Sequence, residues 1–254
     1  MKPLILISND DGIDAPGISL LAQWVAPMGE VWVVAPAEGH SGMSSAMTVN
    51  SPLRIAERPS TVDGARFFTV SGTPVDCVKL AMHHILPRRP DIMACGINHG
   101  SNAGNSVIYS GTMGAVMEAC MIGIPAVGFS LLHHSWQADF SECRPFVERI
   151  TADVIAHGLP ADTCLNVNFP ARVKIKGAKT VRAARSYWTE EFKEYVDPHG
   201  KPFYWLTGRQ VNEEPDNEAT DLYWLDRDFA TIVPCRPEQT NADAIADLAG
   251  RLDC

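Results

Sequence analysis

Short apolar segments alternate with amphipathic segments along the first two-thirds of this chain. Six segments are predicted strands, because each is short, apolar and bounded by turn residues: Leu4–Ser8, Val31–Ala35, Phe67–Val70, Ile92–Cys95, Ala126–Leu131 and Leu165–Phe169. Four segments between them are predicted helices: Ile18–Ala26, Val75–Leu86, Thr112–Ile122 and Phe146–His157. This alternation predicts an α/β fold in which helices cover both faces of a mainly parallel sheet.

The pattern changes from about Ala171 onward. Strand-like segments are then separated by long polar stretches: Lys179–Arg185, Phe203–Leu206 and Phe229–Val233. The acidic stretch Asn212–Asp221 lacks periodicity and is expected to be a loop or a projecting arm, whereas Asn241–Leu252 is expected to be a terminal helix with an Asn N-cap. We therefore predict a Rossmann-like α/β core over residues 1–170 and a smaller β-rich C-terminal extension over residues 171–254.

Composition and charge narrow the class of protein. The 254 residues are 46% hydrophobic and 20% charged, which is typical of a globular protein with a sizeable core. The net charge of -9 argues against a nucleic-acid polymer or an anionic membrane as partner. The N-terminus lacks a signal-peptide pattern, and the seven cysteines are scattered without CxxC pairs. We therefore expect a cytoplasmic protein with reduced thiols.

Two adjacent carboxylates, Asp10 and Asp11, follow the first predicted strand. Adjacent strand residues point to opposite faces, and two neighbouring carboxylates repel each other. A divalent cation would offset that repulsion, and Gly12 would let the backbone turn so that both carboxylates face one ion. Ligands bind at the C-terminal ends of strands in open α/β sheets. The alternative is a polar turn in which Asp10 or Asp11 caps the next helix.

A loop rich in Gly and Asn, residues Gly96–Asn105, follows the predicted strand Ile92–Cys95. Glycine permits close approach of a ligand, and Asn tolerates unusual backbone angles. His99 lies within this loop and is a candidate for proton transfer or substrate contact. Further along, Ser110-Gly111-Thr112 opens a predicted helix, where free N–H groups beside hydroxyls form a natural phosphate site. The alternative is an ordinary turn with a Ser or Thr cap.

Several familiar catalytic motifs are absent. The segment Gly39–Met43 carries Met43 where a G-x-S-x-G nucleophile elbow requires glycine, so we exclude a Ser-His-Asp esterase. The sequence also lacks the GxGxxG of dinucleotide folds, the GK[ST] of P-loops and the H-E-x-x-H of zinc proteases. These absences exclude the corresponding classes of enzyme.

Five blocks occur in the order seen in one known family: SNDDGIDAPGI, VVAPAEGHSGMSSAMT, SGTPVDCVKLA, CGINHGSNAGNSVIYSGTMGAVMEA and GIPAVGFSL. Together they resemble the SurE family of survival-protein-E nucleotidases, which are metal-dependent phosphatases acting on nucleoside monophosphates. The resemblance is clear from Leu4 to about Leu131. Later motifs depart from the family pattern, since Ala219-Thr220-Asp221 stands where GTD is usual.

The resemblance implies roles for individual residues. One divalent cation per subunit would be held by four of them: Asp10, Asp11, Ser41 and Asn98. Of these, Asp10, Asp11 and Asn98 would be catalytic. Phosphate would be contacted by Asn102, Ser110, Gly111 and Thr112. Such an all-oxygen ligand set suits Mg²⁺ or Mn²⁺ rather than zinc.

The expected function is therefore that of a 5'-nucleotidase, which removes phosphate from a small nucleotide. Four alternatives stay open. These are a 3'-nucleotidase activity, a broader phosphatase, an exopolyphosphatase acting on short polyphosphate, and a regulator that binds a metal or nucleotide without turnover.

The region from Lys179 to Asp221 is rich in aromatic residues that the α/β pattern does not accommodate: Tyr187, Trp188, Phe192, Tyr195, Phe203, Tyr204 and Trp205. Clustered exposed aromatics are typical of interfaces. The alternative is that they cover the sheet edge of their own subunit. The family resemblance implies a homodimer or homotetramer, formed through a projecting hairpin and an exchanged C-terminal segment.

Overall fold

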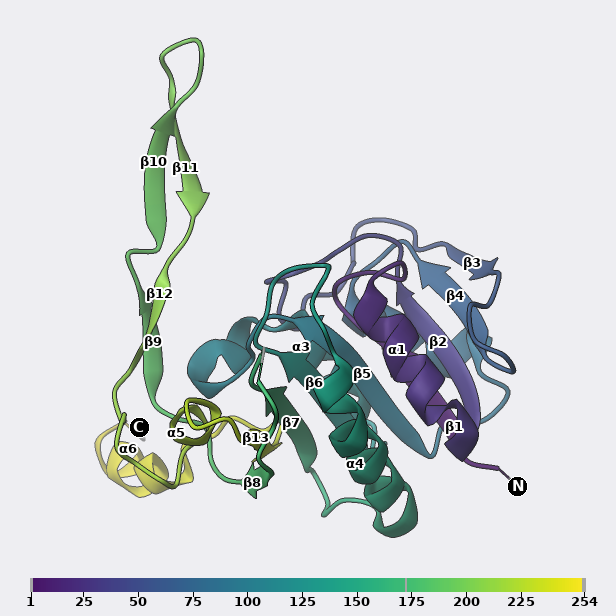
Figure 1. Ribbon diagram of the computed structural model, residues 1–254. Helices are drawn as coiled ribbons and strands as arrows, with labels where there is room; N and C mark the ends of the chain where they lie inside the picture. Colours follow the sequence, from purple (N-terminus) through teal and green to yellow (C-terminus); the bar gives the residue numbers. More distant parts are fainter. Residues whose placement is uncertain (1, 172, 253–254) are drawn as a thin grey trace.

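Nine strands form the central sheet of the computed structural model, which describes residues 2–171 and 173–252. The strand order is β3-β4-β2-β1-β5-β6-β7-β13-β8 (Figure 1). Its parallel middle consists of β4 (Arg66–Val70), β2 (Glu30–Pro36), β1 (Leu4–Ser8), β5 (Ile92–His99), β6 (Ala126–Leu131) and β7 (Cys164–Phe169). The six strands expected in this part of the chain are confirmed, and so is the α/β fold class.

Helices cover both faces of the sheet, as the alternating pattern predicted. On one face lie α1 (Pro16–Val25), which packs against β1, β2 and β5, and α4 (Arg144–His157), which packs against α1 and β5. On the other face lie α2 (Pro74–Leu80) and α3 (Gly111–Met121). Because both faces of the middle strands are covered, a strand such as β1 is buried at every position.

The predicted helix Val75–Leu86 is divided in two. Its first part is α2, which Thr73 caps by accepting a hydrogen bond from the Asp76 N–H group. Its second part, Ala81–Ile85, is a π-helical turn. Short 3₁₀ turns occur elsewhere, at Ala26–Met28, Gly104–Tyr109, Ser141–Cys143 and Ala242–Ala244.

The C-terminal region adds two strands to the main sheet. Strand β13 (Ala230–Cys235) runs antiparallel to β7, and β8 (Ala178–Thr180) runs parallel to β13. The expected strand Lys179–Arg185 was too long, because the chain leaves the sheet after Thr180. Helices α5 (Asp221–Leu225) and α6 (Ile245–Leu252) complete this region, and α6 follows a 3₁₀ turn at which Asn241 makes no side-chain cap.

A long β-arm projects away from the sheet (Figure 1). Its root pairs β9 (Ser186–Thr189) with β12 (Arg209–Asn212), and its outer part pairs β10 (Phe192–Val196) with β11 (Pro202–Leu206). The arm thus precedes the acidic stretch Asn212–Asp221, which is mostly loop. The seven aromatic residues of the arm are between 37% and 68% exposed, so they do not cover the sheet edge of their own subunit.

Four of the observed strands have no counterpart among the sequence predictions: β3 in the main sheet and β9, β10 and β12 in the arm. Strand β3 (Ile55–Arg58) forms an edge of the sheet, antiparallel to β4, and all its residues are exposed. Each of the six cysteines in the described residues carries a free thiol, and Cys254 lies outside those residues. None of the helices in the described chain combines the length and the apolar character that a bilayer crossing requires.

Candidate functional site

The C-terminal ends of β1 and β5 bring the predicted residues together. Asp10 and Asp11 follow β1 after Asn9, while Asn98 and His99 end β5. A pocket of about 460 Å³ opens at this point, and five of the predicted residues line it: Asp10, Ser41, Asn98, Asn102 and Ser110. The other three, Asp11, Gly111 and Thr112, do not line the pocket but lie against residues that do.

Asp10 is the most deeply buried carboxylate of the site. Only 3% of the residue is exposed, and its Oδ1 accepts a hydrogen bond of 2.5 Å from the Thr112 hydroxyl. Gly111 packs so closely that a Cβ atom there would lie 2.9 Å from Asp10 Oδ2. Burial, followed by the charge of Asp11, raises the pKa of Asp10 to about 6, although hydrogen bonds from Thr112 oppose the shift. A bound cation would favour the ionised form instead.

Asp11 is held by His99. The Asp11 Oδ2 atom accepts a hydrogen bond of 3.0 Å from the backbone N–H group of His99 and lies 3.0 Å from its ring Nδ1. The ring is wedged between Trp136, which stacks on it, and Phe140, which meets it edge-on. His99 therefore contacts a predicted metal ligand, and it also lines the pocket. Neither carboxylate caps α1, because the N-cap residue is Ala15, so that alternative is wrong.

Asn98 and Asn102 are fixed by their amide groups. Asn98 Nδ2 donates to the carbonyl oxygen of Gly100 at 3.0 Å, which leaves Oδ1 available to a ligand. Asn102 Nδ2 donates to Ser130 Oγ at 2.8 Å, and its backbone N–H group donates to Asn168 Oδ1 at 2.9 Å. Both residues thus present polar groups in fixed positions at the pocket.

The start of α3 has two functions. Ser110 is the N-cap residue, and its Oγ accepts a hydrogen bond of 3.0 Å from the Met113 N–H group, as the capping alternative expected. Thr112 hydrogen-bonds Asp10 through both its side chain and its backbone. The first turn of α3 therefore braces the buried carboxylate.

The donor chemistry at this site fits a hard divalent cation. Among residues 2–171 and 173–252, no three His, Cys, Asp or Glu side chains converge as a metal cluster would. A cation here would depend on two carboxylates together with neutral oxygens, such as those of Ser41 and Asn98. Such an oxygen set is what Mg²⁺ and Mn²⁺ prefer.

Comparison with known proteins gives the family. The family model described as "Survival protein SurE" matches residues 5–190. The chain belongs to the SurE family. The 5'-nucleotidase SurE of Flavobacterium psychrophilum is 45% identical over 249 residues, which cover 97% of this chain and 96% of that protein. The 5'-nucleotidase SurE of Flavobacterium johnsoniae is 46% identical over 241 residues, covering 94% and 93%.

A solved structure agrees with this assignment. The crystal structure of the SurE protein from Aquifex aeolicus superposes with a TM-score of 0.83 at 34% identity, covering 98% of this chain and 99% of that one. The resemblance to the SurE family that the five sequence blocks indicated is therefore confirmed.

Two supporting features of this SurE-family site were not predicted. Asn166 and Asn168 lie buried in β7, where Asn166 Nδ2 donates to the Asn102 carbonyl oxygen at 2.8 Å and Asn168 binds the Asn102 backbone. Their signal in the sequence is two alternate Asn residues within an apolar strand. Such residues need polar partners when buried.

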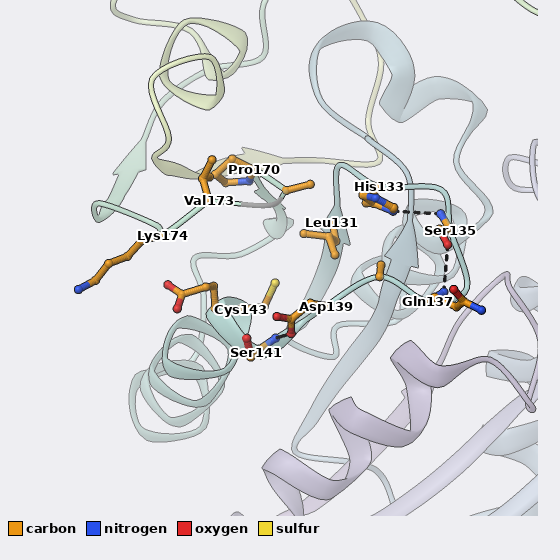
Figure 2. A pocket seen from close by; sticks show the side chains of 13 residues that line it. Leu131, His133, Ser135, Gln137, Asp139, Ser141, Cys143, Pro170, Val173 and Lys174 are labelled. Carbon is orange, nitrogen blue, oxygen red and sulfur yellow. Dashed lines mark hydrogen bonds between the residues drawn. The ribbon is translucent and has the colours of Figure 1, made fainter.

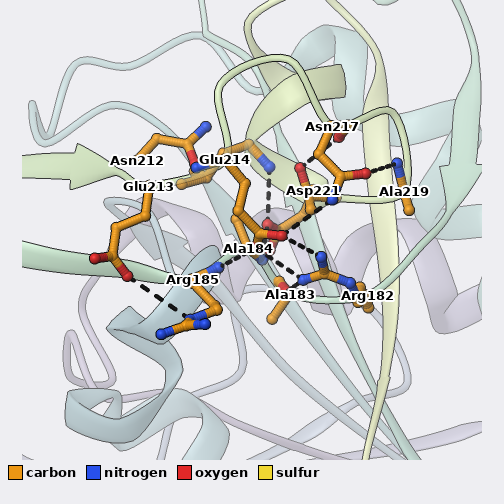
Figure 3. Close-up of polar contacts among 12 residues, drawn as sticks. Arg182, Ala183, Ala184, Arg185, Asn212, Glu213, Glu214, Asn217, Ala219 and Asp221 are labelled. Carbon is orange, nitrogen blue, oxygen red and sulfur yellow. Dashed lines mark hydrogen bonds and ion pairs between the residues drawn. The ribbon is translucent and has the colours of Figure 1, made fainter.

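The second feature is Asp221, which has no exposed surface. Its carboxylate accepts hydrogen bonds of 2.8 Å from three backbone N–H groups: those of Gly104, Ala184 and Leu222. Burial raises the pKa of Asp221 despite these bonds. Figure 3 shows Asp221 beside the ion pair between Arg182 and Glu214. Asp221 thus ties the loop that follows β5 to the segment that leads into the arm.

A separate pocket of about 560 Å³ lies beyond the end of β6 (Figure 2). It is lined by residues such as His133, Ser135, Asp139 and Lys174. No residue that the sequence analysis assigned to the metal or phosphate site lines it. The pocket at the ends of β1 and β5 is therefore the candidate site.

Proposed function

We propose that this chain hydrolyses nucleoside 5'-monophosphates to nucleosides and phosphate. The observation that carries the proposal is the pocket at the ends of β1 and β5, where the buried Asp10 carboxylate meets Ser41 and Asn98. The names of the relatives, 5'-nucleotidase SurE at about 45% identity over nearly the whole chain, support the same activity. They favour it over 3'-nucleotide, polyphosphate or purely regulatory roles.

The proposed ligands of one Mg²⁺ or Mn²⁺ ion are Asp10, Asp11, Ser41 and Asn98. When bound, such an ion lowers the pKa of its water and offsets charge on the phosphoryl group. Asp10, Asp11 and Asn98 are the proposed catalytic residues.

The remaining site residues position substrate or ligands. Asn102, Ser110, Gly111 and Thr112 are proposed to contact the phosphate. Thr112 and His99 each orient one carboxylate through the hydrogen bonds described above.

Phosphate release from a panel of nucleoside monophosphates, with added Mg²⁺ or Mn²⁺, tests the function. Within this assay Ser41→Ala is expected to raise the cation concentration needed for half-maximal rate by about 10- to 100-fold. Excess cation should restore much of the rate, because the lost hydroxyl is a ligand. The matched control is Ser45→Ala, since Ser45 is exposed in the same loop outside the pocket.

A nucleophilic Ser41 would behave differently. The variant would then show no rescue by cation, and the wild-type protein would form a covalent adduct at Ser41 with a serine-directed reagent. Either result would contradict the proposed role of Ser41.

We also propose that the protein is a homodimer or homotetramer in the cytoplasm. Residues 1–170 would carry the chemistry, and residues 171–254 would supply contacts between subunits. The exposed aromatics of the arm and the exposed apolar residues of α6, such as Leu248 and Leu252, support this division. The free thiols of the described cysteines support a reducing compartment.

The assembly has a direct test. Light scattering on the purified chain at micromolar concentration is expected to give at least twice the mass of one 27.7 kDa subunit. A monomer under these conditions would contradict the proposed assembly, and it would leave the proposed chemistry untouched.

A further inference from the structure

We propose that the root of the arm, residues 186–191 and 207–212, forms the subsite for the nucleobase, with Trp188 as its stacking platform. This inference rests on the proposed function, because it assigns the far end of the same substrate. It gives the arm a second role, within its own subunit.

The pocket is lined by two groups of residues. One group is the proposed metal and phosphate residues around Asp10 and Asn98. The other comes from the arm: Trp188, Glu191 and Thr207 at its root and Leu206 at the adjoining end of β11. A nucleoside monophosphate likewise has two different ends, a charged phosphate and a flat aromatic base. The volume of about 460 Å³ lies within the range of small-molecule sites and exceeds what a phosphate group alone would occupy.

Trp188 is held in place before any ligand arrives. Its indole Nε1 donates to Ser106 Oγ at 3.3 Å, and Gln210 Nε2 donates to the same oxygen at 3.2 Å. The backbone of Gly208 packs against the ring, since a Cβ atom there would lie 3.2 Å from Trp188 Cε3. A ring fixed in this way can stack on a base without losing much conformational freedom.

The other aromatic residues of the arm provide a contrast. Tyr187 precedes Trp188 in β9, so its side chain points to the opposite side of the ladder. Neither Tyr187 nor Trp205 of β11 lines the pocket, although both are exposed. Of the arm aromatics in the described chain, Trp188 is the one that lines the pocket. Tyr109 supplies a second aromatic ring to its lining.

The experiment compares a nucleotide with a sugar phosphate in which a hydroxyl replaces the base. Values of kcat/KM are measured for adenosine 5'-monophosphate and for ribose 5-phosphate, which has the same phosphate and sugar. Trp188→Ala is expected to lower kcat/KM about tenfold for the nucleotide, because base stacking on an aromatic ring is lost. It should leave the value for ribose 5-phosphate within about twofold. Trp188→Phe should retain most of the activity on the nucleotide, and Tyr187→Ala should match the wild type on both compounds.

Two outcomes would overturn the proposal. An equal loss of kcat/KM on both compounds in Trp188→Ala would mean that Trp188 supports the site as a whole. No loss of kcat/KM on either compound would mean that Trp188 takes no part in substrate binding. Failure of the proposed function gives a different result, because the wild-type protein would then release phosphate from neither compound. In that event the nucleobase subsite is tested by titration with adenosine. Adenosine should quench the tryptophan fluorescence of the wild type strongly and that of Trp188→Phe much less. Equal quenching in the two proteins would also overturn the proposed subsite.

Discussion

Replacing Asp10 by Asn is expected to reduce phosphate release from a nucleoside monophosphate by about 10²–10³-fold or more while the protein stays folded. The substitution keeps the shape of the side chain and the acceptor for Thr112, but it removes the charge that would hold the cation. Asp11→Asn should have a similar effect on turnover. The measurement is kcat/KM at saturating Mg²⁺ or Mn²⁺, together with circular dichroism to confirm the fold.

The same variant should also change stability, in the opposite direction. Because burial raises the pKa of Asp10 from 3.8 to about 6, the folded state favours the protonated carboxyl. The stability that this group contributes is fully present below about pH 4 and is lost as the pH rises through about 6. At pH 7 the loss in the metal-free wild type is on the order of 2–3 kcal/mol. Asp10→Asn lacks this group and should escape the loss.

Urea unfolding at pH 4.5 and pH 7.5, with a chelator present, measures this difference. Asp14→Asn is the matched control, since the Asp14 side chain is 75% exposed in the same loop. It should alter neither turnover nor the pH dependence of unfolding. Near-wild-type turnover in Asp10→Asn would show that the cation does not bind at this carboxylate.

The second large effect is expected from Asp221→Ala, which should lower the free energy of unfolding by about 3 kcal/mol or more. The substitution leaves the N–H groups of Gly104, Ala184 and Leu222 buried without the acceptor that they share. It also loosens the connection between the arm and the loop that follows β5. Phosphate release should therefore fall as well, although Asp221 does not line the pocket.

Two further variants make this prediction specific. Asp221→Asn keeps one acceptor oxygen and should cost less than Asp221→Ala. Asp216→Ala removes an exposed carboxylate from the preceding loop and should change the free energy of unfolding by less than about 0.5 kcal/mol. An unfolding free energy for Asp221→Ala equal to that of the wild type would mean that water replaces the lost acceptor.

The parts of the fold that could be predicted are those with a buried apolar pattern. Strand β1 was located to the residue, because five buried apolar or small residues end at a turn. Strand β11 was expected as Phe203–Leu206 and lies at Pro202–Leu206, because its run of apolar and aromatic residues is strand-like even though it is exposed. Strands β3 and β10 were not predicted, since all their residues are exposed and no burial pattern distinguishes them. Such strands are defined by their ladder partners, which the local sequence does not reveal.

The site shows the same division between local and distant information. The Asp10–Asp11 pair and the loop around Asn98 could be singled out because each forms a polar motif at a strand end. The contact between His99 and Asp11 joins residues 88 positions apart, and that between Asp221 and Gly104 joins residues 117 apart. Only the order of the strands in the sheet brings such pairs together. For the same reason the presence of Trp188 in the lining of the pocket had no signal in the sequence.

The outer part of the arm has a thermodynamic consequence. Strands β10 and β11 pair only with each other, and every residue in them is exposed. An isolated two-stranded hairpin is marginally stable in water. In a single subunit this hairpin should therefore open at a small free-energy cost, long before the nine-stranded sheet unfolds. Its amide hydrogens would exchange quickly, and a global unfolding curve would report on the sheet while carrying almost no information about the hairpin.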